Sequence, residues 1–173
     1  MSLNIIIDGY NLIRQSSFLS SLDRKDIGLG RNALIDMLAA YKKIKPHRII
    51  VVFDGANAPM FSSERDRIKG IDIRYSKYPD SADTVIKKMV TVHREKALIV
   101  SSDMDIIKYA ESKGVATISS PLFETKIKVA SDFNNMDDSE VEERKWQPTT
   151  KKKGPGRKLS KKKRRNIIKS NKL

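Results

Sequence analysis

The chain has 173 residues, of which 39% are hydrophobic and 32% charged, with a formal net charge of +14 and no cysteine. This length suits one domain with a buried core plus an appendage, and the lack of cysteine excludes disulfides, thiolate metal sites and cysteine nucleophiles. No apolar run approaches the ~20 residues of a membrane helix and no secretory signal is visible, so we predict a cytoplasmic protein without membrane association.

Five short apolar segments predict strands, at residues 4–7, 48–53, 71–75, 97–100 and 115–118. The first contains three consecutive isoleucines, a pattern typical of a strand buried on both faces. Helical spacing of apolar residues predicts helices at 31–43, from Ser81 onward and at 104–113, and we expect a last short helix after the fifth strand. This alternation predicts an α/β three-layer sandwich, in which helices cover both faces of a central parallel sheet.

The chain changes character beyond residue 130. Residues 131–146 are rich in Asp and Glu, and predict an acidic linker after a domain that spans 1–130. Thirteen of the 35 Lys and Arg residues lie between 145 and 173, where there is no Asp or Glu. Such a segment has little to bury and repels itself, so we predict a basic tail over 147–173 that is disordered when unbound.

Acidic residues recur where the predicted strands end. Asp8 ends the first strand and Asp54 the second, Asp83 begins the helix after the third, and Asp103 and Asp105 follow the fourth. Each alone could serve as a helix cap or turn residue. The carboxyl ends of parallel strands meet at one sheet edge, so a central first strand would make these carboxylates neighbours. Together they would repel one another unless a cation lies among them.

Oxygen ligands without Cys or His select a hard divalent ion, here Mg²⁺ or Mn²⁺. Such an ion activates water and stabilises the leaving oxygen in phosphodiester cleavage. Asn11, three residues after Asp8, is placed to orient a carboxylate or a metal-bound water, and the basic segment after the second strand offers Arg65, Arg67 and Lys69 to phosphates. The sequence therefore predicts a metal-dependent phosphodiesterase site without an organic cofactor.

Four motifs in register, "DGYN", "VVFDGA", "SADTVI" and "SSDMDI", resemble those of the NYN-domain nucleases, most closely their YacP-like bacterial branch, which is related to PIN domains and 5′-nucleases. The resemblance covers about residues 3–128. It implies a PIN-like sheet with strand order 3-2-1-4-5, a divalent metal and endoribonuclease activity. By motif, it implies that the catalytic metal ligands are Asp8, Asp83 and Asp103, and that the supporting residues are Asn11, Asp54 and Asp105.

The resemblance also implies partners, because members of this branch are linked to ribosome-associated cleavage of mRNA. We therefore expect RNA, mRNA in particular, and the ribosome as partners. Besides Arg65, Arg67 and Lys69, the basic residues expected to bind RNA lie in the tail: Lys151, Lys152, Lys153, Arg157, Lys158, Lys161, Lys162, Lys163, Arg164 and Arg165.

One position departs from the family pattern. Many relatives carry a second acid after "AD", where Thr84 stands here. Because of this departure, the sequence does not decide whether the site binds one metal ion or two. It also leaves an alternative function open. The alternative is a catalytically inert RNA- or ribosome-binding protein that retains the PIN-like fold and binds through its tail.

Overall fold

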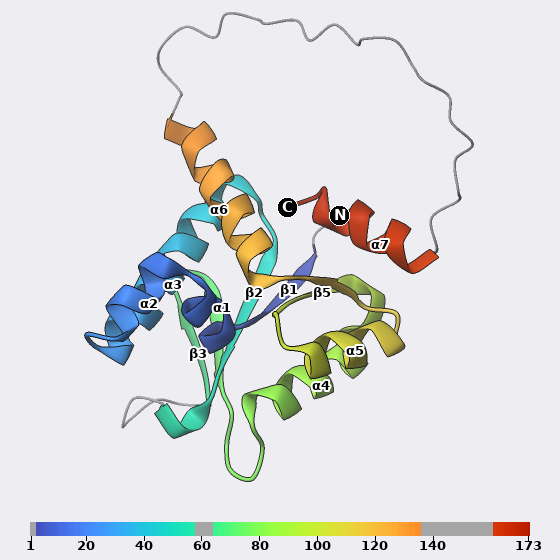
Figure 1. Ribbon diagram of the computed structural model, residues 1–173, viewed down its shortest axis with the longest axis horizontal. Coiled ribbons are helices and arrows are strands. Elements are labelled where there is room, and N and C mark those ends of the chain that lie inside the picture. Colours follow the sequence, from blue (N-terminus) through green and yellow to red (C-terminus); the bar gives the residue numbers. More distant parts are fainter. Residues whose placement is uncertain (1–2, 58–63, 136–160) are drawn as a thin grey trace, which may run out of the picture.

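A six-stranded sheet with the order β3-β4-β2-β1-β5-β6 forms the centre of the computed structural model, which describes residues 3–57, 64–135 and 161–173 (Figure 1). The strands are β1 (Asn4–Asp8), β2 (Arg48–Phe53), β3 (Arg65–Ile68), β4 (Ile71–Tyr75), β5 (Ala97–Val100) and β6 (Ala116–Ile118). All neighbouring pairs are parallel except β3 and β4. The predicted order of the five parallel strands, 3-2-1-4-5, is confirmed, since it corresponds to β4-β2-β1-β5-β6.

The antiparallel edge strand β3 was not predicted. The sequence indicates a basic loop at this point, but residues 65–68 pair with β4 through a tight turn at Lys69 and Gly70. Both turn residues have positive φ, as a two-residue type I′ hairpin requires. All four residues of β3 are exposed, so the strand has no apolar alternation by which the sequence could reveal it.

Helices cover both faces of the sheet, and the predicted three-layer sandwich is confirmed. The helices of one face are α1 (Gly9–Gln15), α2 (Ser17–Asp23), α3 (Ile27–Ile44) and α6 (Ser120–Asn135); those of the other are α4 (Ala82–His93) and α5 (Met104–Ser112). Short 3-10 turns, η1 (Gly55–Asn57) and η2 (Arg94–Lys96), follow β2 and α4. The two seven-residue helices α1 and α2 were not predicted from the sequence.

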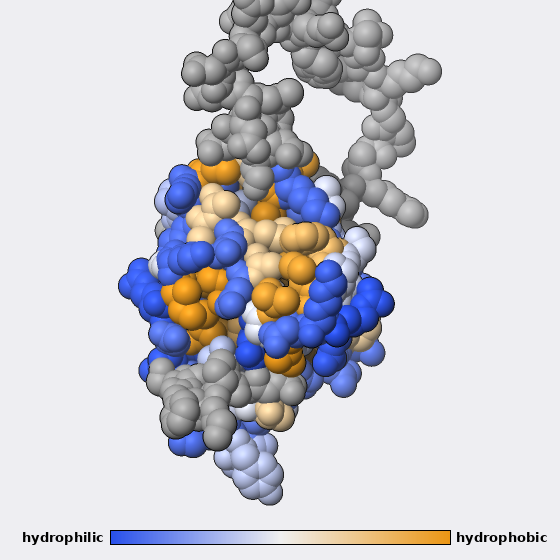
Figure 2. Space-filling model, turned by 90° about the vertical axis from the view of Figure 1, so that its left-hand side faces the viewer, coloured by the Kyte–Doolittle hydropathy of each residue, from blue (hydrophilic) through white to orange (hydrophobic). Residues whose placement is uncertain are grey.

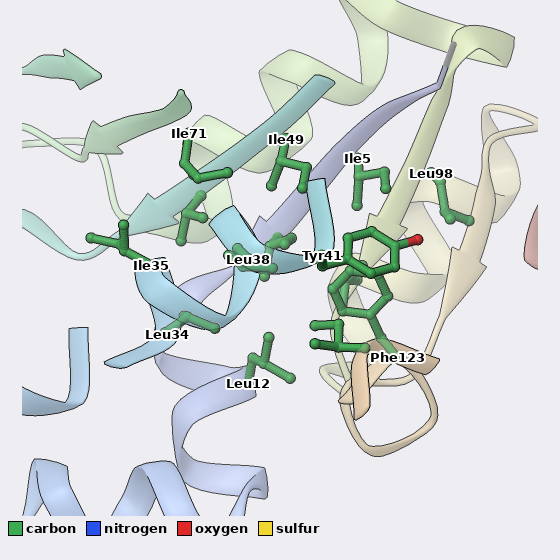
Figure 3. Packing of buried hydrophobic residues seen from close by; sticks show 14 of the residues in the cluster. Ile5, Leu12, Leu34, Ile35, Leu38, Tyr41, Ile49, Ile71, Leu98 and Phe123 are labelled. Carbon is green, nitrogen blue, oxygen red and sulfur yellow. The ribbon is translucent and has the colours of Figure 1, made fainter. Parts of the chain in front are cut away.

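The three consecutive isoleucines of β1 serve two separate cores. Ile5 and Ile7 lie in the larger core, where strand residues face α3 and the aromatic side chains of Tyr41 and Phe123 (Figure 3). Ile6 lies in the smaller core with residues of α4 and α5. A central strand that is buried on both faces needs apolar side chains at successive positions, and this explains the run.

The C-terminal residues 161–173 are ordered against the domain, so the prediction of a disordered tail does not hold for them. Helix α7 (Lys161–Ser170) packs against β6 at the amino ends of the strands (Figure 1). The ammonium of buried Lys169 donates to the carbonyl oxygens of Glu95 and Ala97. Leu173 is also buried, and its carbonyl oxygen accepts a hydrogen bond of 3.2 Å from the Tyr41 hydroxyl.

The predicted division of the chain falls partly on described residues. Helix α6 runs without interruption across the expected boundary at residue 130. Most of the acidic linker and the first part of the tail lie within 136–160, outside the described residues. The separation into a domain, a linker and a tail therefore stays a prediction between 136 and 160.

On the side of the molecule shown in Figure 2, hydrophobic groups gather near the centre of the face, and hydrophilic side chains surround and separate them. Large exposed hydrophobic residues of α2 and α3 include Phe18 and Leu29. Within the described part of the chain, no helix combines the length and the apolar character needed to cross a bilayer.

Candidate active site

Asp8 is held in place at the junction of β1 and α1. It is only 9% exposed, and its Oδ1 accepts a hydrogen bond of 3.2 Å from the backbone N–H of Asn11. Its Oδ2 accepts a bond of 3.1 Å from the Ser101 hydroxyl. The helix starts directly after Asp8, and a Cβ on Gly9 would lie 2.4 Å from the Phe53 ring. Asp8 therefore caps α1, and the carboxylate is fixed in one orientation.

Asn11 connects three segments around this carboxylate. Its side-chain oxygen accepts hydrogen bonds from the backbone N–H of Ser102, at 2.9 Å, and from the Ser120 hydroxyl, at 2.7 Å. These bonds tie α1 to the segment after β5 and to the start of α6. Asn11 was expected to orient a carboxylate or a water. In the structure its backbone orients Asp8, while its side-chain oxygen is engaged by two donors.

Asp103 caps the helix after β5. Its Oδ1 accepts from the backbone N–H groups of Asp105, at 2.7 Å, and of Ile106, at 3.3 Å. Its own N–H donates to the Ser101 hydroxyl at 3.0 Å. Because Ser101 also donates to Asp8, one buried serine links the two carboxylate positions. Asp105 itself is exposed on the first turn of α5.

Asp54 directly follows β2, and Asp83 belongs to the helix that follows β4. The Oδ1 of Asp54 accepts a hydrogen bond of 3.0 Å from the N–H of Ala56. The next residue, Gly55, approaches the backbone of Ser76 so closely that a Cβ would lie 1.8 Å from its carbonyl oxygen. Asp83 lies in the first turn of α4, where the helix dipole stabilises a negative charge.

These residues share one cavity of about 390 Å³ at the carboxyl ends of the strands. Its lining residues are Asp8, Tyr10, Asn11, Arg14, Gln15, Asp54, Ala56, Ala82, Asp83 and Asp103. Five of the six residues predicted for the catalytic centre are thus together, and Asp105 is not among the lining residues. Arg14 and Gln15 were not predicted. Their spacing of three and four residues from Asn11 places them on the same helix face, and that is the signal that could have revealed them.

Burial and the neighbouring carboxylates act in the same direction on the pKa values of two acids of the cavity. Burial raises the pKa of Asp8 to about 6; the hydrogen bonds from Asn11 and Ser101 oppose this shift, and the charges of Asp83 and Asp103 add to it. Burial also raises the pKa of Asp83, to which the charges of Asp103, Asp105 and Asp54 contribute against the opposing charge of Lys87. The cavity therefore favours the arrival of positive charge.

The donor set suits a hydrated hard cation. In residues 3–57, 64–135 and 161–173, no three Asp, Glu or His side chains are close enough to form a ready-made metal cluster. Mg²⁺ commonly retains several waters and contacts only one or two carboxylates of the protein. Carboxylates that line one cavity without converging on a single point fit that mode of binding.

The predicted RNA-binding cations lie away from this cavity. Arg65 and Arg67 are on β3, and Lys69, in the following turn, pairs with Asp36. In α7, Arg164 is exposed, whereas half-buried Arg165 pairs with Glu95 at 2.7 Å and donates to the carbonyl of Gly114. The side chains of Lys161, Lys162 and Lys163, and residues 151–158, lie outside the described part.

Comparisons with known proteins agree with this architecture. The chain is similar to the crystal structure of Rae1 (YacP) from Bacillus subtilis, with a TM-score of 0.66 and 21% identity over 78% of each chain. A crystal structure of a mutant of that protein gives a TM-score of 0.65 and 20% identity, over 78% of this chain and 80% of the other. A comparison with curated protein sequences gave no significant match.

The family model described as the YacP-like NYN domain matches residues 5–171. The match continues beyond residue 128, where the expected resemblance ended, and includes α7. This extension agrees with the packing of α7 on β6. The chain therefore belongs to the YacP-like NYN domain family.

Proposed function

We propose that the protein is a divalent-metal-dependent endoribonuclease that hydrolyses RNA phosphodiester bonds in the carboxylate cavity. Membership of the NYN family implies a nuclease-type function related to RNA. The observation that carries the proposal is the cavity itself, in which Asp8, Asp54, Asp83 and Asp103 come from four separate segments of the chain. The local capping and turn roles of these acids do not by themselves explain why all four face one hollow at the cost of mutual repulsion.

The chain's own residues have distinct roles in this proposal. Asp8, Asp83 and Asp103 would hold a hydrated Mg²⁺ or Mn²⁺, one or two of them directly and the others through its waters, with Asp54 in support. When bound, such an ion lowers the pKa of a water and stabilises charge on phosphate oxygens. Asn11 and Ser101 fix the orientation of Asp8. Arg14, exposed at the rim in the last turn of α1, is positioned to attract a phosphate group.

We extend the proposal to the substrate and its location. The YacP-like motifs support mRNA associated with ribosomes as the substrate, and hence a cytoplasmic site of action. The exposed cations of β3 and α7 would supply affinity for RNA that is independent of its sequence.

A cleavage assay tests the activity. Asp8→Asn, Asp83→Asn and Asp103→Asn each retain the shape of the side chain and remove its charge, so each should lower the rate of RNA cleavage at least ~100-fold. Asp80→Asn is the matched control, because Asp80 lies just before α4 but pairs with Lys88 outside the cavity. It should cleave as the wild type does. Cleavage that persists in excess EDTA, or in all three cavity variants, would contradict the proposal.

The alternative of an inert RNA-binding protein has one observation in its favour. Thr84, where many relatives have an acid, bonds with Ser81 at 3.1 Å and is not among the residues that line the cavity. If Thr84 reduces the site to a single ion, activity should be low but should rise with Mn²⁺ concentration. Unchanged RNA binding together with no cleavage at any Mn²⁺ or Mg²⁺ concentration would favour the inert protein.

A further inference from the structure

A second polar hollow, of about 380 Å³, lies on the sheet away from the carboxylate cavity. Its lining includes four arginines from three strands, Arg48 of β2, Arg65 and Arg67 of β3, and Arg74 of β4, and we call it the arginine hollow. The other lining residues are Asp66, Asp72 and Ile73. Asp72 lies on the same face of the sheet as the arginines, whereas Asp66 is the register partner of Ile73, whose side chain belongs to the larger core. Four guanidinium groups thus share one carboxylate on this face, and the hollow has an excess of positive charge.

The repulsion between these arginines lowers the stability of the fold when no anion is bound. Arg65 lies directly opposite Arg74 in the antiparallel pair, and like charges in that position destabilise a sheet. Burial lowers the pKa of Arg74, and the charges of Arg65 and Arg48 lower it further, against Asp72 and Glu64. The structure therefore holds cations together that repel one another.

The carboxylate of Asp72 is shared by two of the arginines. Asp72 lies 3.0 Å from Nε of Arg48 and 3.6 Å from Nε of Arg67. The carboxylate of Asp66, in turn, accepts a hydrogen bond from the backbone N–H of Arg67. The side chains of Arg48 and Arg67 remain 55% and 69% exposed. An anion from solution can reach these guanidinium groups without breaking the core.

The sheet register connects the arginine hollow to the carboxylate cavity. Asp8 is the partner of Val52, Val52 is the partner of Arg74, and Arg74 is the partner of Arg65. With about 4.8 Å between strands, Arg74 lies two strands and roughly 10 Å from Asp8 along this row. The four residues thus form a line from the acids to the outer edge of the sheet.

The two sites also share one face of the sheet. Side chains alternate along a strand, and Ile71, Ile73 and Tyr75 of β4 belong to the larger core. The intervening Arg74 therefore points to the opposite face, as does its partner Val52, which packs with α4. Asp83, at the start of α4, faces the carboxylate cavity from this same side. A single-stranded RNA that extends from the carboxylate cavity along this face can therefore reach the arginine hollow beside α4.

We propose that the arginine hollow is an exosite for the phosphate backbone of single-stranded RNA that continues beyond the carboxylate cavity. The proposal rests on the proposed function for the identity of the polymer. Guanidinium groups bind phosphate through paired hydrogen bonds, and they keep their charge when partly buried. No aromatic side chain from residues 3–57, 64–135 or 161–173 lines the hollow, so contacts to phosphates, independent of base sequence, are the expected mode. In this exosite Arg48 and Arg74 bind phosphate together with Arg65 and Arg67.

Binding of a fluorescein-labelled oligouridylate, measured by anisotropy at several salt concentrations, tests the exosite. All proteins carry Asp8→Asn so that RNA stays intact. Adding Arg65→Ala and Arg74→Ala should weaken affinity about tenfold and lower the slope of log affinity against log salt by ~1.4, or ~0.7 for each lost phosphate contact. The matched control, Lys43→Ala with Lys108→Ala, removes two exposed charges from α3 and α5, and should change affinity less than about twofold.

The melting temperature without RNA provides a second measurement. Removing two opposed arginines should leave it unchanged or raise it, so weaker binding cannot be ascribed to unfolding. Equal losses in the arginine and control variants, or unchanged affinity and slope, would overturn the exosite. So would displacement of the RNA by a polyglutamate peptide as effective as unlabelled RNA, which would indicate an acidic protein partner. Failure of cleavage in the wild type would contradict the nuclease but leave this binding result intact.

Discussion

Asp8 carries a structural and a chemical role in one side chain. It caps α1 through the N–H of Asn11, and it contributes charge to the carboxylate cavity. Burial raises its pKa from the ordinary 3.8 to about 6, so the folded protein binds a proton there more readily than the unfolded chain. An ionised Asp8 therefore lowers the stability of the metal-free fold, as is typical of functional carboxylates.

This cost predicts a dependence of stability on pH. Well below pH 3.8 both states hold the proton and Asp8 costs nothing; above about pH 6 the full cost, on the order of 3 kcal/mol, applies. In EDTA, Asp8→Asn should therefore increase the free energy of unfolding near pH 8 and leave it almost unchanged at about pH 3. Urea unfolding at the two pH values measures this. Asp80→Asn should show no such gain, and a gain of equal size at both pH values would contradict the assignment.

The meeting of the acids could be predicted from the sequence, whereas their fine positioning could not. Asp8, Asp54 and Asp103 each follow an apolar run, and parallel strands place such residues at one edge. The use of the Asn11 oxygen depends on Ser102 and Ser120, which are distant in sequence and were unremarkable there. Side-chain partners of this kind follow from tertiary packing, which local patterns do not encode.

Among the elements, the buried strands were predictable and the exposed strand was not. The five parallel strands are short apolar runs, so their sequence differs clearly from the polar helix surfaces between them. β3 consists of exposed residues and owes its place to the turn at Lys69 and Gly70. The turn between β2 and η1 is equally specific, because Gly55 lies against Ser76.

A substitution at that turn tests how it holds Asp54. Gly55→Ala would place a Cβ 1.8 Å from the Ser76 carbonyl oxygen, so the backbone after β2 must shift. We expect a loss of about 2–4 kcal/mol in the free energy of unfolding, with reduced cleavage, because Asp54 moves with the turn. Ser76→Ala is the control: it removes only the 2.9 Å bond to the Gly55 N–H and should cost about 1 kcal/mol. Equal, small losses in both would show that the turn adapts.

At the scale of the whole molecule, the two ends of the strands have different tasks. The carboxyl ends carry the acidic cavity, and the amino ends are covered by α7 and the C-terminal residues (Figure 1). The sequence suggested that the basic tail had little to bury and would be disordered when unbound. Lys169 shows why this failed: its aliphatic stem is covered while its ammonium donates to two carbonyl oxygens, of Glu95 and Ala97. A cationic segment can therefore be part of the fold.

Two lysines of this segment separate folding from charge. Lys169 is buried and donates to backbone carbonyls, while Lys172, three residues later, is exposed. Lys169→Gln leaves those carbonyl groups without their charged donor, so it should lower the free energy of unfolding by about 1–3 kcal/mol. Lys172→Gln removes the same charge and should change stability by less than about 0.5 kcal/mol. Urea unfolding compares the two variants. If their stabilities were equal, α7 would be a surface attachment, and its basic residues would be available chiefly for RNA.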